Sequence, residues 1–153
     1  MKRLLVVAHV PSPNTLRLRD AIVSGASNRE IEDVETIAKS PFEAGPEDVL
    51  IADAVILGTT ENLGYMSGAL KDFFDRTYYP ILELTRGKPY ALYIRAGMDG
   101  TGTRRAVQSI TTGLKWRPVQ DPLICRGDWD EAFISQCAEL GMAMAAGLEV
   151  GVF

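Results

Sequence analysis

The sequence predicts a single α/β domain in which helices cover both faces of a parallel β-sheet. Its 153 residues are enough for one compact domain, spanning 1–153. The segments Leu4–Ala8 and Ala54–Leu57 are continuous apolar runs, which are typical of strands buried on both faces. Strand candidates also alternate with helix candidates along the chain, and this alternation is typical of a parallel sheet joined by right-handed crossovers.

The first half of the chain begins with the strand at 4–8. Turn residues at Pro11–Asn14 follow it and precede an amphipathic helix. The apolar face of this helix consists of Leu18, Ala21, Ile22 and Gly25. Val34–Ile37 is short and polar enough to be an edge strand. Pro46–Ala52 supplies a short helix before the buried strand at 54–57.

The second half continues the alternation. Met66–Tyr79 has helical spacing, and Pro80 is expected to end this helix. Pro89–Ile94 is the fourth strand, and Leu123–Cys125 is a short fifth strand. The helix between these strands has an apolar face made by Ala106, Val107, Ile110 and Leu114. A helix-start box at Asp128–Glu131 opens the last helix. The apolar face of that helix consists of Phe133, Cys137, Leu140, Met144 and Leu148.

The polarity of the second strand indicates its place in the sheet. With that strand at an edge, the domain is a five-stranded parallel sheet in the order 2-1-3-4-5 between two layers of helices. In a sheet of this order, ligands bind outside the carboxyl ends of strands one, three and four. The loops that follow those strands are therefore the candidate site.

Composition and charge exclude several classes of function. Hydrophobic residues make up 46% and charged residues 24%, with a net charge of −4, so neither disorder nor a nucleic-acid partner is expected. No apolar run approaches the ~18 residues of a membrane-spanning helix, and the N-terminal run stops at His9 without a convincing cleavage site. We therefore expect a cytoplasmic protein with no membrane partner. Cys125 and Cys137, with a single histidine in the chain, make neither a zinc site nor a disulfide framework, and both are expected in the core.

The first candidate loop, residues 9–15, joins the first strand to a helix N-terminus. Free N–H groups and the helix dipole favour an anion such as a phosphate there, and Ser12, Asn14 and Thr15 add polar donors. The loop has neither a Walker ending nor a GxGxxG fingerprint, which disfavours ATPases and standard dinucleotide-binding folds. Two alternatives stay open: Asn14 only caps the helix, and His9 is either structural or a contact to the phosphate.

Two further loops follow the third and fourth strands. Thr59–Tyr65 includes Gly64, which lets the backbone approach closely, and has apolar and aromatic side chains that suit the faces of a planar heteroaromatic ligand. The loop after the fourth strand has three glycines within six residues from Gly97, which suits main-chain contact with a ligand edge. The alternatives are that Tyr65 is a surface turn residue, that Met66 fills the core and that the glycine-rich loop is a mobile turn.

The segment Gly58–Arg76 resembles the second flavin loop and the following helix of the flavodoxin superfamily. Its sequence is GTTENLGYMSGALKDFFDR. It is similar to the NAD(P)H-dependent FMN reductase and quinone reductase branches in four short motifs: Gly-Thr, Met-Ser-Gly, Leu-Lys and Phe-Asp-Arg. Thr60 stands where proline is common, and residues 9–11 replace the usual Ser or Gly start of the phosphate loop. Through the order of the five strands the resemblance extends over nearly the whole chain, and it implies a flavodoxin-like three-layer sandwich.

This resemblance implies FMN as the cofactor and NAD(P)H as the co-substrate. It places the phosphate in the first loop and the isoalloxazine ring against the second and third loops. The residues implied to bind FMN are Ser12, Asn14, Thr15, Thr60, Glu61, Asn62, Leu63, Gly64, Tyr65, Met66, Ala96, Gly97 and Gly102.

Three functions are compatible with these features. The first is an oxidoreductase that passes electrons from NAD(P)H through FMN to a quinone or another small-molecule acceptor. No catalytic side chain and no metal are expected for it, because the flavin carries the chemistry. The second is a flavodoxin-type electron carrier between protein partners, and the third is a flavin-free binding domain on the same fold. Trp116 and Trp129 both follow the flavin loops, so an open ring face favours the first function. A homodimer or a tetramer is compatible with the sequence.

Overall fold

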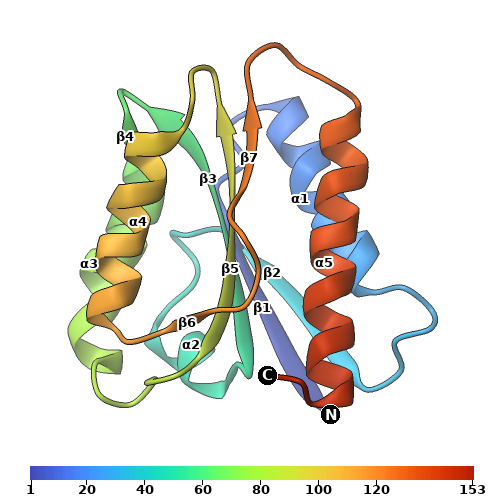
Figure 1. Ribbon diagram of the computed structural model, residues 1–153. Coiled ribbons are helices and arrows are strands. Elements are labelled where there is room, and N and C mark those ends of the chain that lie inside the picture. The colour runs from blue at the N-terminus through green and yellow to red at the C-terminus, as the bar shows by residue number, and fades with distance from the viewer.

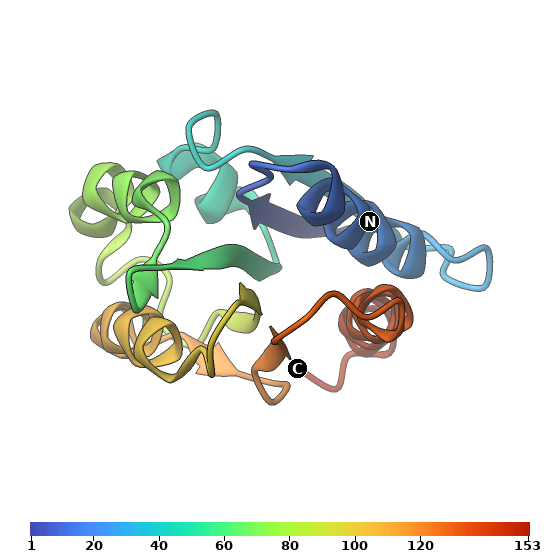
Figure 2. The same ribbon diagram turned by 90° about the horizontal axis from the view of Figure 1, so that it is seen from above.

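The computed structural model describes residues 1–153 as one sheet with helices on both faces (Figure 1). The elements in chain order are β1 (Lys2–Ala8), α1 (Pro13–Ala26), β2 (Val34–Lys39), α2 (Pro46–Ile51), β3 (Ala54–Asn62), β4 (Tyr65–Met66), α3 (Gly68–Ile81), β5 (Pro89–Ala96), α4 (Thr101–Gly113), β6 (Arg117–Pro118), β7 (Leu123–Arg126) and α5 (Ala132–Val150). Figure 2 shows α1 and α5 on one face of the sheet and α2, α3 and α4 on the other. The predicted α/β class is confirmed.

The sheet has seven strands. Four of them, β2, β1, β3 and β5, lie side by side in this order and are parallel. The position beyond β5 is shared by two short parallel strands. β6 pairs with Pro89 and Tyr90 at the start of β5, and β7 pairs with Tyr93–Ala96 at its end. β4 pairs antiparallel with the last residues of β3.

The predicted five-stranded sheet in the order 2-1-3-4-5 is therefore wrong in its number of strands. The expected fifth strand at Leu123–Cys125 is present as β7, and β6 is an additional short strand on the same side of β5. Pro118 ends β6 and Pro122 precedes β7, and neither residue has a backbone N–H with which to continue the ladder. The two-residue strands β4 and β6 were missed because a segment that short has no periodicity and becomes a strand only through pairing.

Helix α3 also differs from its predicted limits of Met66 and Tyr79. It starts at Gly68 because Ser67 caps it, with the backbone N–H of Leu70 donating to the Ser67 Oγ at 3.1 Å. It continues past Pro80 to Ile81. A proline in the last turn removes only one of the final helical hydrogen bonds, so the helix ends soon after Pro80 and not before it.

Alternate side chains of β1 fill two separate cores. Leu5 and Val7 face the core under α2, α3 and α4. Leu4, Val6 and Ala8 face the core under α1 and α5. All five are buried. Burying an aliphatic side chain of this size contributes about 1.5–3 kcal/mol, so burial on both faces strongly favours the interior position of β1.

The core between the sheet and the pair α1 and α5 contains both cysteines. Cys125 and Cys137 are free thiols with no exposed surface, as the sequence predicts. The two helices touch through their backbones at two glycines. A Cβ on Gly141 would lie 2.0 Å from the Ile22 carbonyl oxygen, and a Cβ on Gly25 would lie 1.9 Å from that of Ala138. None of the helices combines the length and the apolar character required to cross a bilayer.

Replacing Gly141 by Ala is expected to lower the free energy of unfolding by about 1–3 kcal/mol, because the added methyl group forces α1 and α5 apart. Urea denaturation measures this change. Gly68→Ala is the matched control, since a Cβ there meets no atom within 4 Å. Equal stability of the two variants would contradict the close backbone contact.

Candidate functional site

The carboxyl ends of β1, β3, β5 and β7 meet at one edge of the sheet, at the top of Figure 1. Four segments leave the sheet at this edge: the β1–α1 loop, the β3–β4 hairpin, the β5–α4 loop and the β7–α5 loop. The first three contain the residues implied to bind FMN. The parallel direction of the strands therefore brings together segments that are far apart in the sequence.

The β1–α1 loop ends in a complete capping box. Ser12 is the N-cap of α1, and the backbone N–H of Thr15 donates to its Oγ at 3.2 Å. The Thr15 Oγ1 in turn accepts from the backbone N–H of Ser12 at 3.0 Å. Pro13 occupies the first helical position. The hypothesis that Asn14 caps the helix is therefore wrong, because Ser12 can reach the third helical N–H and Asn14 lies already inside the helix.

Asn14 and His9 have polar groups without a hydrogen-bond partner in the protein. The Asn14 side chain is exposed and makes no hydrogen bond within the protein. The His9 backbone continues the strand pairing by donating to the Gly58 carbonyl. The His9 Nδ1 is inaccessible to solvent and has no hydrogen-bond partner. Burial also lowers the pKa of His9 below its usual value of 6.5, which favours the neutral ring.

The second predicted loop is a β-hairpin. Glu61 pairs with Met66 and Asn62 with Tyr65, so β3 continues beyond the sheet and returns as β4. The two turn residues, Leu63 and Gly64, have φ values of 53° and 74°. Positive φ at both positions is typical of a type I′ turn, the tight turn that matches the twist of a hairpin. The expectation of an irregular loop at Thr59–Tyr65 is corrected accordingly.

The side chains of the hairpin have different surroundings. Met66 is 2% exposed and packs in the core with α3 and α4, so only its main chain is available at the site. Leu63 is fully exposed and Tyr65 is 42% exposed. The Thr60 hydroxyl donates to the Asn62 Oδ1 at 2.8 Å. The tip therefore offers apolar surface, and its polar side chains hold the hairpin itself.

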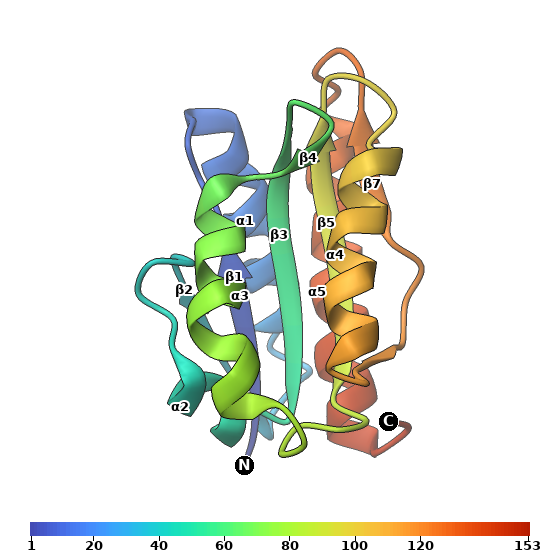
Figure 3. The ribbon, with the colours of Figure 1, turned by 90° about the vertical axis from the view of Figure 1, so that its left-hand side faces the viewer.

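The hairpin is joined to the start of α4. The Thr103 hydroxyl donates to the Tyr65 carbonyl oxygen at 2.9 Å, and a Cβ on Gly102 would lie 2.2 Å from the Gly64 carbonyl oxygen. Gly102 thus permits a contact that a larger residue would prevent. The remaining residues of the third predicted loop lie beside this contact, with Ala96 fully buried and Gly97 exposed. Figure 3 shows the hairpin beside the first turn of α4.

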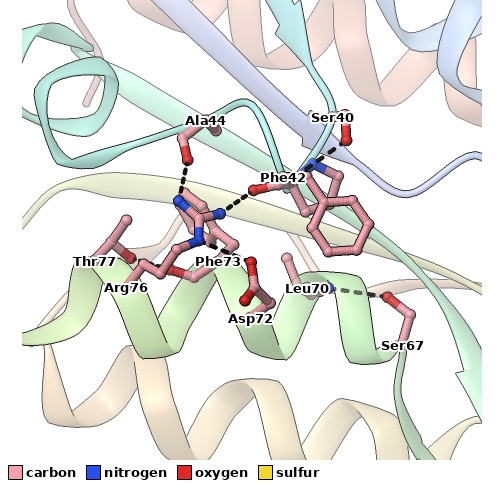
Figure 4. Close-up of polar contacts among 10 residues, drawn as sticks. Ser40, Phe42, Ala44, Ser67, Leu70, Asp72, Phe73, Arg76 and Thr77 are labelled. Carbon is pink, nitrogen blue, oxygen red and sulfur yellow. Dashed lines mark hydrogen bonds and ion pairs between the residues drawn. The ribbon is translucent and has the colours of Figure 1, made fainter.

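Several residues of the segment Gly58–Arg76 stabilise the fold and are not available to a ligand. The Arg76 guanidinium donates to the carbonyl oxygens of Ala44 at 3.0 Å and Pro41 at 2.5 Å and pairs with the Asp72 carboxylate, fixing the loop after β2 (Figure 4). The Thr59 hydroxyl accepts from the backbone N–H of Ser67 at 3.0 Å. These contacts give Arg76 and Thr59 structural roles in the segment.

The sequence did not indicate that the β7–α5 loop also lies at this edge of the sheet. The ring of Trp129 lies between two arginines. The guanidinium of Arg17 on α1 is 5.4 Å from the ring centre, and that of Arg95 on β5 is 5.8 Å from it. Arg95 also donates to the carbonyl oxygens of Ala96 and Cys125. Trp129 lies outside the hairpin and the β5–α4 loop, as expected, yet it belongs to the same end of the sheet. No local pattern connects these three residues, because they come from separate elements.

The candidate site is an open edge. The hollows on the molecular surface lie elsewhere: beside β1 and α2, along residues 118–122, along α5 and between α3 and α4. A planar ligand bound against the hairpin would therefore keep part of its surface accessible.

A parallel sheet with a capped helix after β1 and two joined segments after β3 and β5 defines the flavodoxin-like class of α/β proteins. The family model of NADPH-dependent FMN reductases matches residues 12–123, and the chain belongs to this family. Membership supports a flavin-binding redox function with FMN as cofactor.

Curated relatives agree with this family. A flavodoxin from Aquifex aeolicus is 32% identical over 114 residues, which cover 74% of this chain and 60% of that protein. An NAD(P)H dehydrogenase (quinone) from Archaeoglobus fulgidus is 31% identical over 99 residues, covering 50% of this chain and 52% of that protein. The matched stretch thus spans between half and two thirds of the length of these relatives.

Solved structures confirm the fold. A flavodoxin from the domain Archaea has a TM-score of 0.79 and 20% identity, covering 94% of this chain and 96% of that one. Flavodoxin 2 from Bacillus cereus has a TM-score of 0.74 and 21% identity, covering 95% of this chain and 99% of that one.

His9 is expected to make stability depend on pH. Because its pKa is lowered in the folded protein, the unfolded chain binds the proton first, so the free energy of unfolding falls as the pH drops below 6.5. Urea denaturation at pH 7.5 and 5.5 should show a smaller loss for His9→Gln than for the wild type. His9 is the only histidine, so no other imidazole contributes. An identical loss in both proteins would contradict the burial of this ring.

Proposed function

We propose that the protein is an FMN-dependent oxidoreductase that takes electrons from NAD(P)H and passes them to a quinone or another small-molecule acceptor. The proposal rests on one observation: the N-terminus of α1 lies at the same end of the sheet as the hairpin of the FMN-reductase family segment. A phosphate-bearing planar cofactor needs both features.

The start of α1 suits the phosphate of FMN. Its first turn has no acidic residue that would repel an anion. The backbone N–H of Asn14 lies at the second helical position, and the exposed Asn14 amide can donate beside it.

The hairpin and the β5–α4 loop suit the ring of FMN. Leu63 and Tyr65 supply exposed apolar surface for a ring face, and the main chain around Gly97 is open. When bound, FMN supplies the hydride acceptance and electron transfer, while the protein binds the ring, orients it and limits its contact with water. The proposal needs no acid–base pair of side chains.

Access to the ring supports a reductase. Neither the hairpin nor the β5–α4 loop contains tryptophan, and Trp129 is held by the two flanking arginines. A ring face without an indole across it leaves room for a nicotinamide at the ~3–3.5 Å separation that hydride transfer requires. A quinone in the same place would then accept electrons from the reduced flavin.

The open edge also supports a second candidate, an electron carrier between proteins. A carrier exposes its flavin edge to protein partners, and the Aquifex aeolicus relative is a flavodoxin. The two functions differ in whether NAD(P)H reduces the protein directly.

Asn14→Ala is expected to weaken FMN binding about tenfold, since a hydrogen bond to a charged phosphate contributes about 1.5 kcal/mol. Riboflavin has no phosphate, so its affinity should stay unchanged. Titration of the protein with each flavin, followed by flavin fluorescence, measures both affinities. Asn28→Ala, at the opposite end of α1, is the matched control. Equal losses for FMN and riboflavin would mean that Asn14 acts through folding.

Reduction by nicotinamides decides between the two functions. We expect anaerobic mixing of the FMN-loaded protein with NADPH or NADH to bleach the flavin absorbance in a stopped-flow experiment, and a quinone to restore it. Dithionite serves as the positive control. If dithionite bleaches the flavin and neither nicotinamide does, the reductase is excluded and the electron carrier takes its place.

A further inference from the structure

The Glu61 side chain connects the hairpin to the β5–α4 loop. Its Oε1 accepts from the backbone N–H of Met98, and its Oε2 accepts from the backbone N–H of Gly100, both at 2.9 Å. Both carboxylate oxygens are thus bound to the main chain of one loop. Hydrogen bonds with an ionised acceptor are stronger than neutral ones, so the pair holds that loop at a defined distance from β3.

Glu61 is itself held in place. It belongs to β3 and pairs with Met66 in the hairpin. Beyond Glu61, the hairpin makes the Thr103 hydrogen bond and the close Gly64–Gly102 contact with α4. The hairpin is therefore joined to the β5–α4 loop and the first turn of α4 by the two Glu61 hydrogen bonds, the Thr103 hydrogen bond and the Gly64–Gly102 contact.

The Glu61 carboxylate also lies at the start of α4. Its N-cap is Gly100, which has a φ of 72° and no side chain with which to cap the helix. The first turn of α4 also contains no acidic residue. The Asp99 carboxylate, just before the N-cap, accepts from the N–H of Thr101 at 3.0 Å. Glu61 adds from another strand an acceptor for the N–H of Gly100 and a second negative charge near the helix N-terminus, which its dipole favours.

We propose that Glu61 is a positioning residue that holds the β5–α4 loop in the conformation that receives the flavin ring. This inference rests on the proposed binding of FMN at this edge. The loop has glycines at 97 and 100 and an exposed Met98, so without its two hydrogen bonds to Glu61 it would have to be ordered when the ring binds. A loop fixed in advance removes that ordering cost from binding.

The opposite role would be competition, in which the Glu61 carboxylate occupies N–H groups that the ring needs. The two roles predict opposite signs. If Glu61 positions the loop, its removal weakens FMN and riboflavin alike, because both ligands share the ring. If Glu61 competes with the ring, its removal strengthens both.

The experiment uses Glu61→Ala, Glu61→Gln and the wild type, with Glu30→Gln as the control. Glu30 is exposed, its side chain has no partner, and it lies in the α1–β2 loop at the other end of the sheet. Amide hydrogen exchange of the FMN-free protein reports the loop directly. We expect the Met98 and Gly100 amides to exchange at least about tenfold faster in Glu61→Ala, while the amides of α3 keep their wild-type rates.

Flavin titration of the same proteins completes the test. We expect Glu61→Ala to weaken FMN and riboflavin by about tenfold each, and Glu61→Gln, which keeps one acceptor oxygen, by about threefold. Glu30→Gln should match the wild type. Unchanged exchange at Met98 and Gly100, or flavin affinity that is unchanged or higher in Glu61→Ala, would overturn the inference. A wild type that binds no FMN would instead overturn the proposed function, and the exchange data would still show whether Glu61 holds the loop.

Discussion

Burial of β1, β3 and β5 on both faces is the constraint on which the rest of the structure depends. The side chains of Leu4–Ala8 and Ala54–Leu57 have almost no exposed surface. The backbone N–H and C=O groups of these two strands therefore have no access to water and have to bond to neighbouring strands. Helices that cover both faces also serve as the crossover connections, and such connections make neighbouring strands parallel. The carboxyl ends of the strands then meet at one edge, and the segments leaving that edge form the candidate site.

At this edge the protein satisfies most of its polar groups by itself. Ser12 and Thr15 form the capping box of α1, and Glu61 accepts from the N–H groups of Met98 and Gly100 just before α4. The buried His9 Nδ1 and the exposed Asn14 side chain are left without a partner. An open edge built in this way has a defined shape without an enclosing cavity. A ligand meets main chain that is already ordered, which lowers the entropy lost on binding.

The segment that resembles the flavin reductases has two physical roles. Ser67 and Arg76 fix the start of α3 and the loop after β2, and Met66 fills the core beneath the hairpin. Leu63 and Gly64 instead shape a hairpin tip that projects from the sheet. The segment therefore specifies a fold and the form of one loop together. This is why it identifies the family.

The sequence by itself determined the alternation of strands and helices, the two-sided burial of strands such as Leu4–Ala8, and the family, because these follow from patterns among neighbouring residues. Only the tertiary structure decided the additional strand β6, the hairpin pairing and the partners of Glu61 and Trp129. Glu61 lies 37 residues from Met98 in the chain, and Trp129 meets arginines from α1 and β5. Such contacts depend on how whole elements are placed by the packing of two cores, and a local pattern carries no information about that placement.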